Sequence, residues 1–175
     1  MILTEYDISY AVKEYLYDKK YTIITWNPPG SQGTFTIPNP DKDPTYKGQT
    51  GSESPDLIAF NFEEIVFVEA KDSISKSYSD IEKLIKLLSN NKRRELLFKI
   101  CTKQMEALEH KIDLEKLKIK IGVAVPYAED IKKLYNKYKN ITIYSVKCNF
   151  QEWDNKIIDA GINMKDIFKI QEEVI

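Results

Sequence analysis

Hydrophobic and polar positions follow two different periods along this 175-residue chain. Near the N-terminus the apolar side chains recur at the spacing of one helix face, which predicts an amphipathic helix from about Glu5 to Lys19. Its apolar stripe consists of Ile8, Ala11, Val12, Tyr15 and Leu16. Thr4 and Asp7 have the spacing of a capping box, which indicates where the helix begins. The apolar and β-branched residues from Tyr21 to Trp26 then predict a first strand.

Two short apolar runs, Leu57–Phe60 and 65–70, flank four residues from Asn61 to Glu64 and predict an antiparallel hairpin. If Phe60 pairs with Ile65, Asp56 lies opposite Glu69, although a bulge would shift this register by one residue. Lys71 then shares their face, because side chains alternate along a strand. Two opposed carboxylates repel each other and need a cation between them. The hairpin therefore predicts a divalent-metal site with a lysine beside it, which is the chemistry of a nuclease.

The rest of the chain alternates between helical and strand patterns, which predicts an α/β fold in a single domain of residues 1–175. We expect a mixed sheet of about five strands flanked by helices. The elements expected after the hairpin are helices at Ser77–Ser89 and Arg94–Lys111, a buried strand at Lys118–Val125, a short helix at Ala128–Lys139, a strand at Ile141–Val146, and a tail at 150–175 with two short helices divided by Gly161.

The residues Pro55-Asp56 and Glu69-Ala70-Lys71 resemble the signature of the PD-(D/E)xK nuclease superfamily, which includes many restriction endonucleases, junction resolvases and repair exonucleases. The resemblance covers residues 4–147 as an order of elements and residues 54–71 as a residue-level match. It implies a restriction-endonuclease-like core. It also implies that Asp56, Glu69 and the carbonyl of Ala70 hold Mg²⁺, for which Mn²⁺ would substitute. Lys71 would orient the attacking water or help to deprotonate it.

The resemblance also implies further site residues. Members of the superfamily often carry an acid on the first helix, and here Glu5 is the best fit, with Glu14 as the alternative. The helix after the Glu-x-Lys strand often brings a glutamine or lysine to the scissile phosphate. Gln104 is the expected residue and Lys103 the second choice, although an ordinary exposed glutamine is the more common explanation.

The charge distribution is uneven although the formal net charge is only −1. Basic residues are in excess directly after Lys71, and their densest point, Lys92, Arg93 and Arg94, is expected to contact phosphates. The alternative is that these side chains form ordinary solvated helix faces.

Residues 27–54 are rich in proline and glycine and form a long loop or flap that leads into Asp56. A loop of this length inside a compact domain often has a function. Gln49 and Ser52 are expected to hydrogen-bond phosphates or bases. A solvated flap without a ligand explains the segment equally well.

Several classes of protein are excluded. No apolar run has the ~18 residues of a membrane span, no secretory signal is evident, and the two cysteines lack metal-ligand spacing, so we expect a cytoplasmic protein without a membrane partner. The single histidine and the lack of a phosphate-binding glycine loop exclude His-based nucleases and ATPases.

The most favoured function is a Mg²⁺-dependent DNA endonuclease of restriction type, acting as a homodimer. A partner methyltransferase is expected only if the enzyme is of restriction type, and the sequence itself gives no sign of one. A structure-specific nuclease, such as a junction resolvase or repair enzyme, is one alternative. A DNA-binding or assembly module that keeps the fold without cutting is another.

Overall fold

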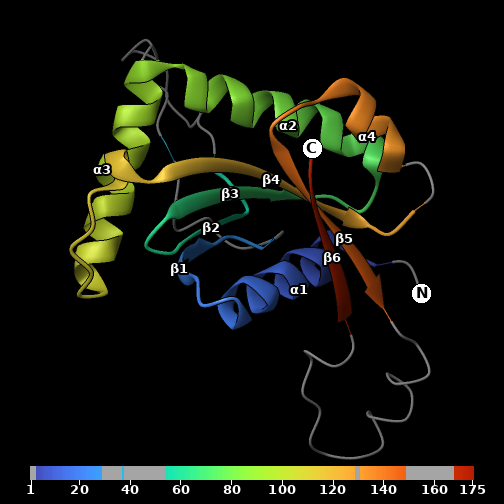
Figure 1. The fold of residues 1–175 in the computed structure, drawn as a ribbon, viewed down its shortest axis with the longest axis horizontal. Helices are drawn as coiled ribbons and strands as arrows, with labels where there is room; N and C mark the ends of the chain where they lie inside the picture. The colour runs from blue at the N-terminus through green and yellow to red at the C-terminus, as the bar shows by residue number, and fades with distance from the viewer. Residues whose placement is uncertain (1–2, 29–36, 38–53, 129–130, 149–167) are drawn as a thin grey trace, which may run out of the picture.

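The computed structural model describes residues 3–28, 37, 54–128, 131–148 and 168–175. They form three layers, with a six-stranded sheet between helices on its two faces (Figure 1). The strands are β1 (Thr22–Trp26), β2 (Leu57–Phe60), β3 (Glu64–Ala70), β4 (Lys118–Pro126), β5 (Ile141–Cys148) and β6 (Phe168–Val174). The helices are α1 (Glu5–Asp18), α2 (Ile74–Ser89), α3 (Asn91–Ala107) and α4 (Lys132–Lys137), with one 3₁₀ turn at Leu114–Lys116.

The six strands lie in the sheet in the order in which they occur in the chain. β3, β4 and β5 run parallel, whereas β1–β2, β2–β3 and β5–β6 are antiparallel pairs. The sheet is therefore mixed, as the sequence predicts. The crossover between β3 and β4 contains α2 and α3, as a parallel connection requires.

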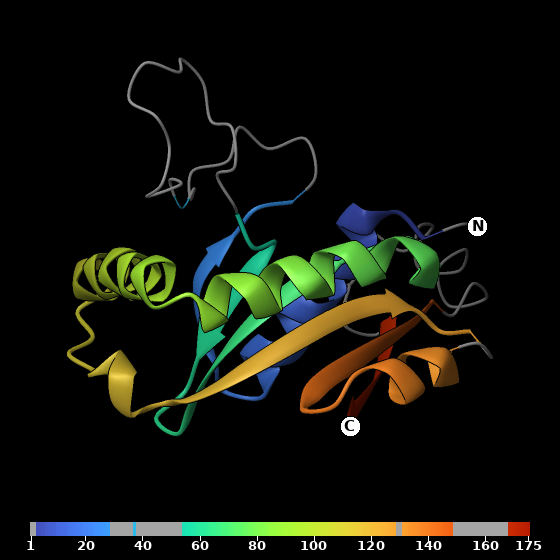
Figure 2. The same ribbon diagram turned by 90° about the horizontal axis from the view of Figure 1, so that it is seen from above.

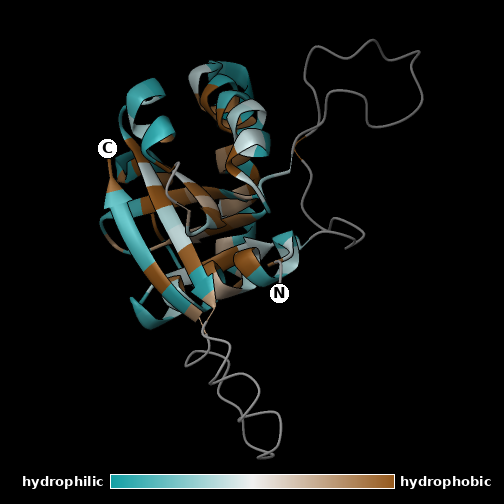
Figure 3. Ribbon diagram, turned by 90° about the vertical axis from the view of Figure 1, so that its right-hand side faces the viewer, coloured by the Kyte–Doolittle hydropathy of each residue, from teal (hydrophilic) through white to brown (hydrophobic). Residues whose placement is uncertain are grey.

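Each face of the sheet has its own hydrophobic core. α1 packs on one face against Leu57, Val66 and Val68. α2 and α3 cover the opposite face, where they contact Ile58, Phe67 and other side chains. Along β2 and β3, these side chains alternate with those that contact α1. α4 packs on the same face as α2, over β4 and β5. Figure 1 shows α2 above the sheet and α1 below it, Figure 2 views the molecule from the α2 side, and in Figure 3 the hydrophobic colouring lies mainly where helices and strands meet.

The hairpin register predicted from the sequence is confirmed. Phe60 pairs with Ile65 and Leu57 pairs with Val68, without a bulge between β2 and β3. The Asn61 side chain fixes the turn, because its Oδ1 accepts hydrogen bonds from the backbone N–H groups of Glu63 and Glu64.

The predicted helices are also present. α1 begins with the predicted capping box between Thr4 and Asp7. The break between α2 and α3 falls at Asn90, whose side chain accepts a hydrogen bond from the backbone N–H of Arg93 and so caps α3. α2 begins at Ile74, three residues before the predicted start, and α4 is shorter than the predicted helix at 128–139.

The prediction of two helices in the C-terminal tail was wrong in its last part, because Phe168–Val174 forms the edge strand β6. The sheet therefore has six strands and not about five. Residues 150–167, with Gly161, lie outside the described residues. The same holds for Gln49, Ser52 and most of the 27–54 segment, within which Ile37 is buried in the core beneath α2 and α3.

Within the described ranges, every helix is too short or too polar to cross a membrane.

Candidate functional site

A cluster of carboxylates surrounds Lys71 at the point where β3 ends. The Lys71 ammonium lies 3.4 Å from Oε2 of Glu5 at the start of α1 and 3.4 Å from Oδ2 of Asp80 on α2. Oδ2 of Asp56, which precedes β2, is 4.0 Å away. Side chains from α1, from α2 and from the ends of β2 and β3 therefore contribute to one group of charged side chains, each at most 26% exposed. We call Glu5, Asp56, Glu69, Lys71 and Asp80 the carboxylate–lysine cluster.

The backbone around Asp56 is held in place from both sides. The N–H of Asn27, directly after β1, donates to the Asp56 carbonyl at 2.7 Å. The Asn27 side-chain amide donates to the Pro55 carbonyl at 3.1 Å and to Ser54 Oγ at 3.0 Å. On the other side, the N–H of Ala70 donates to Oδ2 of Asp56 at 2.8 Å. These bonds extend the pairing of β2 with its neighbours by one residue and fix the carboxylate at the end of the sheet.

Asp56 and Glu69 face each other across the hairpin, as the confirmed register requires. Each carboxyl group affects the pKa of the other. Burial raises the pKa of the Glu69 carboxyl well above its ordinary value, and the adjacent Asp56 charge raises it further. Burial likewise raises the pKa of Asp56, although the Ala70 N–H and the Lys71 charge oppose this change. A shared proton is thus favoured when no cation neutralises the pair.

Lys71 stays protonated in this environment. Burial by itself would lower the pKa of its ammonium group, but the nearby charges of Asp56, Glu69, Glu5 and Asp80 outweigh burial and raise the pKa above the ordinary value. One positive charge therefore stands among four acidic side chains. The cluster carries an excess of negative charge whenever its acids are ionised, and this excess favours a further cation.

The oxygen ligands at Asp56, Glu69 and Ala70 have the chemistry that Mg²⁺ prefers. In the part of the chain that is described, no three Asp, Glu, His or Cys side chains stand at the spacing of a ready-made metal site. Mg²⁺ is usually held by one or two carboxylates and several waters, which Asp56 and Glu69 satisfy. The Ala70 N–H points to Asp56 whereas the Lys71 N–H points to β4, so the Ala70 carbonyl is directed to the Asp56 side. These three residues would hold the ion.

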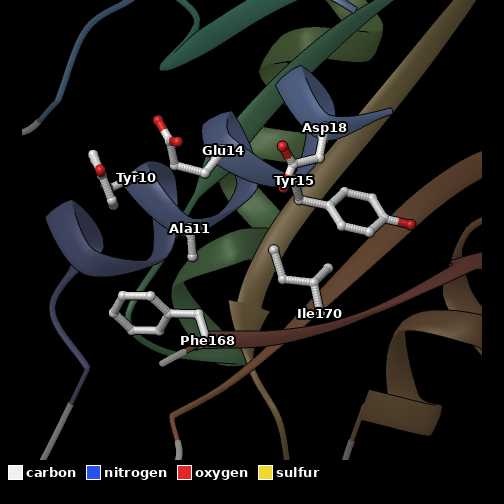
Figure 4. A pocket seen from close by; sticks show the side chains of 7 residues that line it. All are labelled: Tyr10, Ala11, Glu14, Tyr15, Asp18, Phe168 and Ile170. Carbon is white, nitrogen blue, oxygen red and sulfur yellow. The ribbon is translucent and has the colours of Figure 1, made fainter. Parts of the chain in front are cut away.

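Of the two acids proposed on the first helix, the structure brings Glu5 into the cluster and keeps Glu14 apart from it. Glu14 pairs with Lys13 at 3.0 Å. It also lines a separate cavity between α1 and β6, shown in Figure 4. The other residues around this cavity are Tyr10, Ala11, Tyr15, Asp18, Phe168 and Ile170.

Asp80 is a member of the cluster that the sequence analysis missed. It lies on α2 beside the buried stripe that includes Ser77, Ile81 and Leu84, and its side chain is 13% exposed. Lys83, one turn further along the helix, pairs with its other carboxylate oxygen. One feature of the sequence could have identified Asp80: it is an acid next to the apolar face of the helix that follows the Glu-x-Lys strand.

Gln104 and Lys103 are not brought to the cluster. Both side chains are exposed near the C-terminal end of α3. This end of α3 lies near the hairpin turn, since the rings of Phe60 and His110 are in contact at 5.4 Å. The cluster is at the other end of β2 and β3. The C-terminal end of α3 is therefore far from the cluster along the sheet. The described contacts give Gln104 no part in the site.

The basic residues Lys92, Arg93 and Arg94 lie at the start of α3, away from the cluster. Asp80 is nine residues before the end of α2, a distance of about 14 Å along a helix. Arg94 has a structural role, because its guanidinium donates to the Leu88 carbonyl at 3.3 Å and to Asn91 Oδ1 at 3.0 Å. Lys92 is exposed.

Comparisons of the chain with protein-family models, curated proteins and solved structures found no match. The fold and the carboxylate–lysine cluster are therefore the basis for any functional conclusion.

Proposed function

We propose that this protein is a Mg²⁺-dependent nuclease that hydrolyses phosphodiester bonds of DNA, with a restriction-endonuclease-like core. One observation carries the proposal. Asp56 and Glu69 are opposed across a hairpin, and the ammonium of Lys71, two residues after Glu69, lies among the acids Glu5, Asp56 and Asp80. Grouping four acids around one lysine is costly for stability, and such arrangements are typical of functional sites.

Each side chain has a task in this reaction. Asp56, Glu69 and the Ala70 carbonyl would bind Mg²⁺, which supplies an activated water and neutralises charge on the phosphate. The Lys71 ammonium would orient the attacking water and stabilise the negative charge that develops on the phosphoryl oxygens. Glu5 and Asp80 hold this ammonium from two helices, so that the lysine is positioned before substrate binds.

Within this class, a restriction-type endonuclease is the first choice. Cutting both strands of a duplex at one site favours a homodimer, and a methyltransferase would protect the host sequence. A structure-specific nuclease has the same chemistry and differs in the substrate that it selects. Restriction activity would give discrete fragments from a plasmid, whereas a junction or repair nuclease would prefer branched or damaged DNA.

A second candidate function is a DNA-binding or assembly module that does not cut. It is favoured by the ion pairs of Lys71 with three acids and by the lack of a ready-made three-ligand metal group within the described residues. In such a module the ion pairs would serve only to hold α1, α2 and the hairpin together.

The test is cleavage of supercoiled plasmid with Mg²⁺ or Mn²⁺, compared with EDTA. Lys71→Met should abolish metal-dependent cleavage. Lys120→Met is a matched control, because Lys120 is also 16% exposed and also bridges two acids, Glu64 at 3.0 Å and Glu172 at 3.5 Å. Loss of cleavage in the Lys71 variant alone would support the nuclease.

Equal activity of both variants would overturn the assignment of Lys71. An absence of metal-dependent cleavage on plasmid, branched, single-stranded and RNA substrates would favour the module that does not cut.

A further inference from the structure

Three aromatic rings form a cluster on the outer side of α1, next to the carboxylate–lysine cluster. The rings of Tyr6 and Tyr10 lie nearly parallel, with centroids 6.4 Å apart. The Trp26 ring, at the end of β1, is tilted against both, at 5.6 Å from Tyr6 and 5.8 Å from Tyr10. We call these three residues the aromatic platform.

The platform is joined directly to the proposed active site through the backbone. Tyr6 follows Glu5, whose carboxylate contacts the Lys71 ammonium. Trp26 pairs with Leu57 across the sheet, and Leu57 follows Asp56. Consecutive Cα atoms are 3.8 Å apart, so the platform begins one residue after Glu5 on α1, and on β1 Trp26 lies opposite the residue that follows Asp56. Tyr6 is the platform residue nearest to the cluster in sequence, so a nucleic acid with a phosphate near the Lys71 ammonium would place a neighbouring nucleotide near Tyr6.

The rings are held in place but are not all buried. The indole N–H of Trp26 donates to Ser9 Oγ at 3.2 Å, which fixes the ring against α1. The Lys13 ammonium lies 4.4 Å from the centroid of Trp26 and 4.6 Å from that of Tyr10. Tyr6 remains 48% exposed. Lys13 also pairs with Glu14, so it serves to hold the rings in place. A rigid, partly open aromatic surface has the features of a surface that stacks nucleobases.

We propose that the aromatic platform stacks an unpaired nucleotide next to the phosphate that is bound at the carboxylate–lysine cluster. The ligand is a single-stranded segment of nucleic acid, and Tyr6 provides the open ring face. This inference rests on the proposed function for its choice of ligand. A nucleic acid is favoured over a protein partner because Tyr6 directly follows Glu5, whose carboxylate contacts the Lys71 ammonium. Stacking on aromatic rings is tolerant of sequence, so the platform would add affinity without reading bases.

The experiment measures binding and does not depend on cleavage. A short fluorescent single-stranded DNA is titrated with the whole protein in EDTA, and again with Ca²⁺ in place of Mg²⁺. Tyr6→Ala should weaken binding by about fivefold or more, which is the low end for one base–aromatic stack. Tyr6→Phe should bind like the wild type, because stacking does not need the hydroxyl group. Tyr17→Ala is the matched control, since Tyr17 is an exposed tyrosine on the same helix, at 62%.

A second readout uses the fluorescence of Trp26. The chain has two tryptophans, so a Trp153→Phe variant leaves Trp26 as the sole emitter, and its emission should change when DNA binds. Equal binding by Tyr6→Ala and Tyr17→Ala, or no binding of single-stranded DNA by the wild type, would overturn the platform. If none of the plasmid, branched, single-stranded and RNA substrates is cut but Tyr6→Ala weakens DNA binding, the nuclease proposal fails and the platform stands. If plasmid is cut and Tyr6→Ala binds DNA like the wild type, the nuclease proposal stands and the platform proposal fails.

Discussion

The Lys71 ammonium lies 3.4 Å from Oδ2 of Asp80, which joins the end of the Glu-x-Lys strand to the helix that follows it. α2 is anchored by buried side chains that include Ile81 and Leu84, so Asp80 has a fixed position. Lysine has four rotatable side-chain bonds and would otherwise sample many positions. The contact therefore makes Asp80 a positioning residue for Lys71.

Asp80→Asn keeps the size of the side chain but removes its charge, so we expect kcat for DNA cleavage to fall by roughly 10–100-fold, the usual effect of losing a supporting contact. KM should change little, since Asp80 has no contact with substrate in this proposal. Asp80→Glu should restore part of the rate. Glu82→Gln is the control, because Glu82 lies on the same helix but pairs with Lys137 at 2.8 Å. Equal losses in Asp80→Asn and Glu82→Gln would contradict the positioning role.

Glu69 and Glu64 lie on the same strand, β3, but their environments shift their pKa values in opposite directions. Burial and Asp56 raise the pKa of Glu69. Burial would also raise the pKa of Glu64, but hydrogen bonds from Tyr21 and Lys120 outweigh it and lower the pKa. Ionised Glu69 is thus unfavourable in the metal-free protein, whereas ionised Glu64 is favourable.

We therefore expect Glu69→Gln to raise the melting temperature of the metal-free protein at neutral pH and Glu64→Gln to lower it. About 1 kcal/mol corresponds to about 2–4 °C in a domain of this size. Mg²⁺ should stabilise the wild type and Glu64→Gln, and should not stabilise Glu69→Gln. Thermal unfolding with Mg²⁺ or EDTA measures both effects. A lower melting temperature for metal-free Glu69→Gln would argue against a strained carboxyl pair.

The same pKa shifts predict that the contributions of Glu69 and Glu64 to stability change with pH in opposite directions. The contribution of Glu69 is most favourable below its unfolded pKa of about 4.3 and is lost as pH rises through the raised folded value. The contribution of Glu64 is present above that unfolded value and is lost as pH falls through the lowered folded value. In EDTA, the difference in stability between Glu69→Gln and wild type should therefore grow from about pH 4 upward. A difference that is constant with pH would show that the charge of Glu69 is not its cause.

The parts of the fold that were predicted correctly depend on neighbours in the sequence. The register of β2 and β3 follows from a four-residue turn, which leaves few ways to pair Phe60 with Ile65. The capping box of Thr4 and Asp7 is likewise local. The grouping of Asp56, Glu69 and Lys71 followed from this register alone, so the centre of the candidate site was accessible to sequence reasoning.

The missed parts depend on contacts between distant segments. β6 contains Glu172 at a position that faces α1, and this acid interrupts the apolar alternation of Phe168 and Ile170. Glu172 is accommodated only because Lys120 pairs with it at 3.5 Å and the Tyr15 hydroxyl donates to it at 2.8 Å. Neither partner can be inferred from the sequence of residues 150–175 alone. Asp80 was missed for the same reason, because its partner Lys71 lies outside its helix.

Arg94 and Lys92 are close in sequence, and the structure predicts different effects of removing them. Arg94→Ala loses hydrogen bonds to the Leu88 carbonyl and to Asn91, which should lower the free energy of unfolding by about 1–2 kcal/mol. Lys92→Ala should leave stability unchanged. If Lys92 contacts a phosphate, its removal should weaken DNA binding for all sequences and reduce the salt dependence by about one counterion. Denaturant unfolding and binding at several salt concentrations separate the two effects. A loss of stability in Lys92→Ala would contradict the prediction that Lys92 has no structural role.

Gly122 on β4 provides the space for a buried tyrosine ring. A Cβ atom at this position would lie 2.8 Å from Cε2 of Tyr144 and 3.0 Å from Cγ2 of Val68, and both side chains are almost fully buried. Both neighbours are packed in the core and would have to shift, so Gly122→Ala should destabilise the protein by about 1–3 kcal/mol, the usual cost of overpacking. Because leucine lacks the ring atom in question, the cost should be smaller in a Tyr144→Leu background, as a double-mutant cycle of denaturant unfolding would measure. An equal cost in both backgrounds would place the strain in Val68 or the backbone and not in the contact with Tyr144.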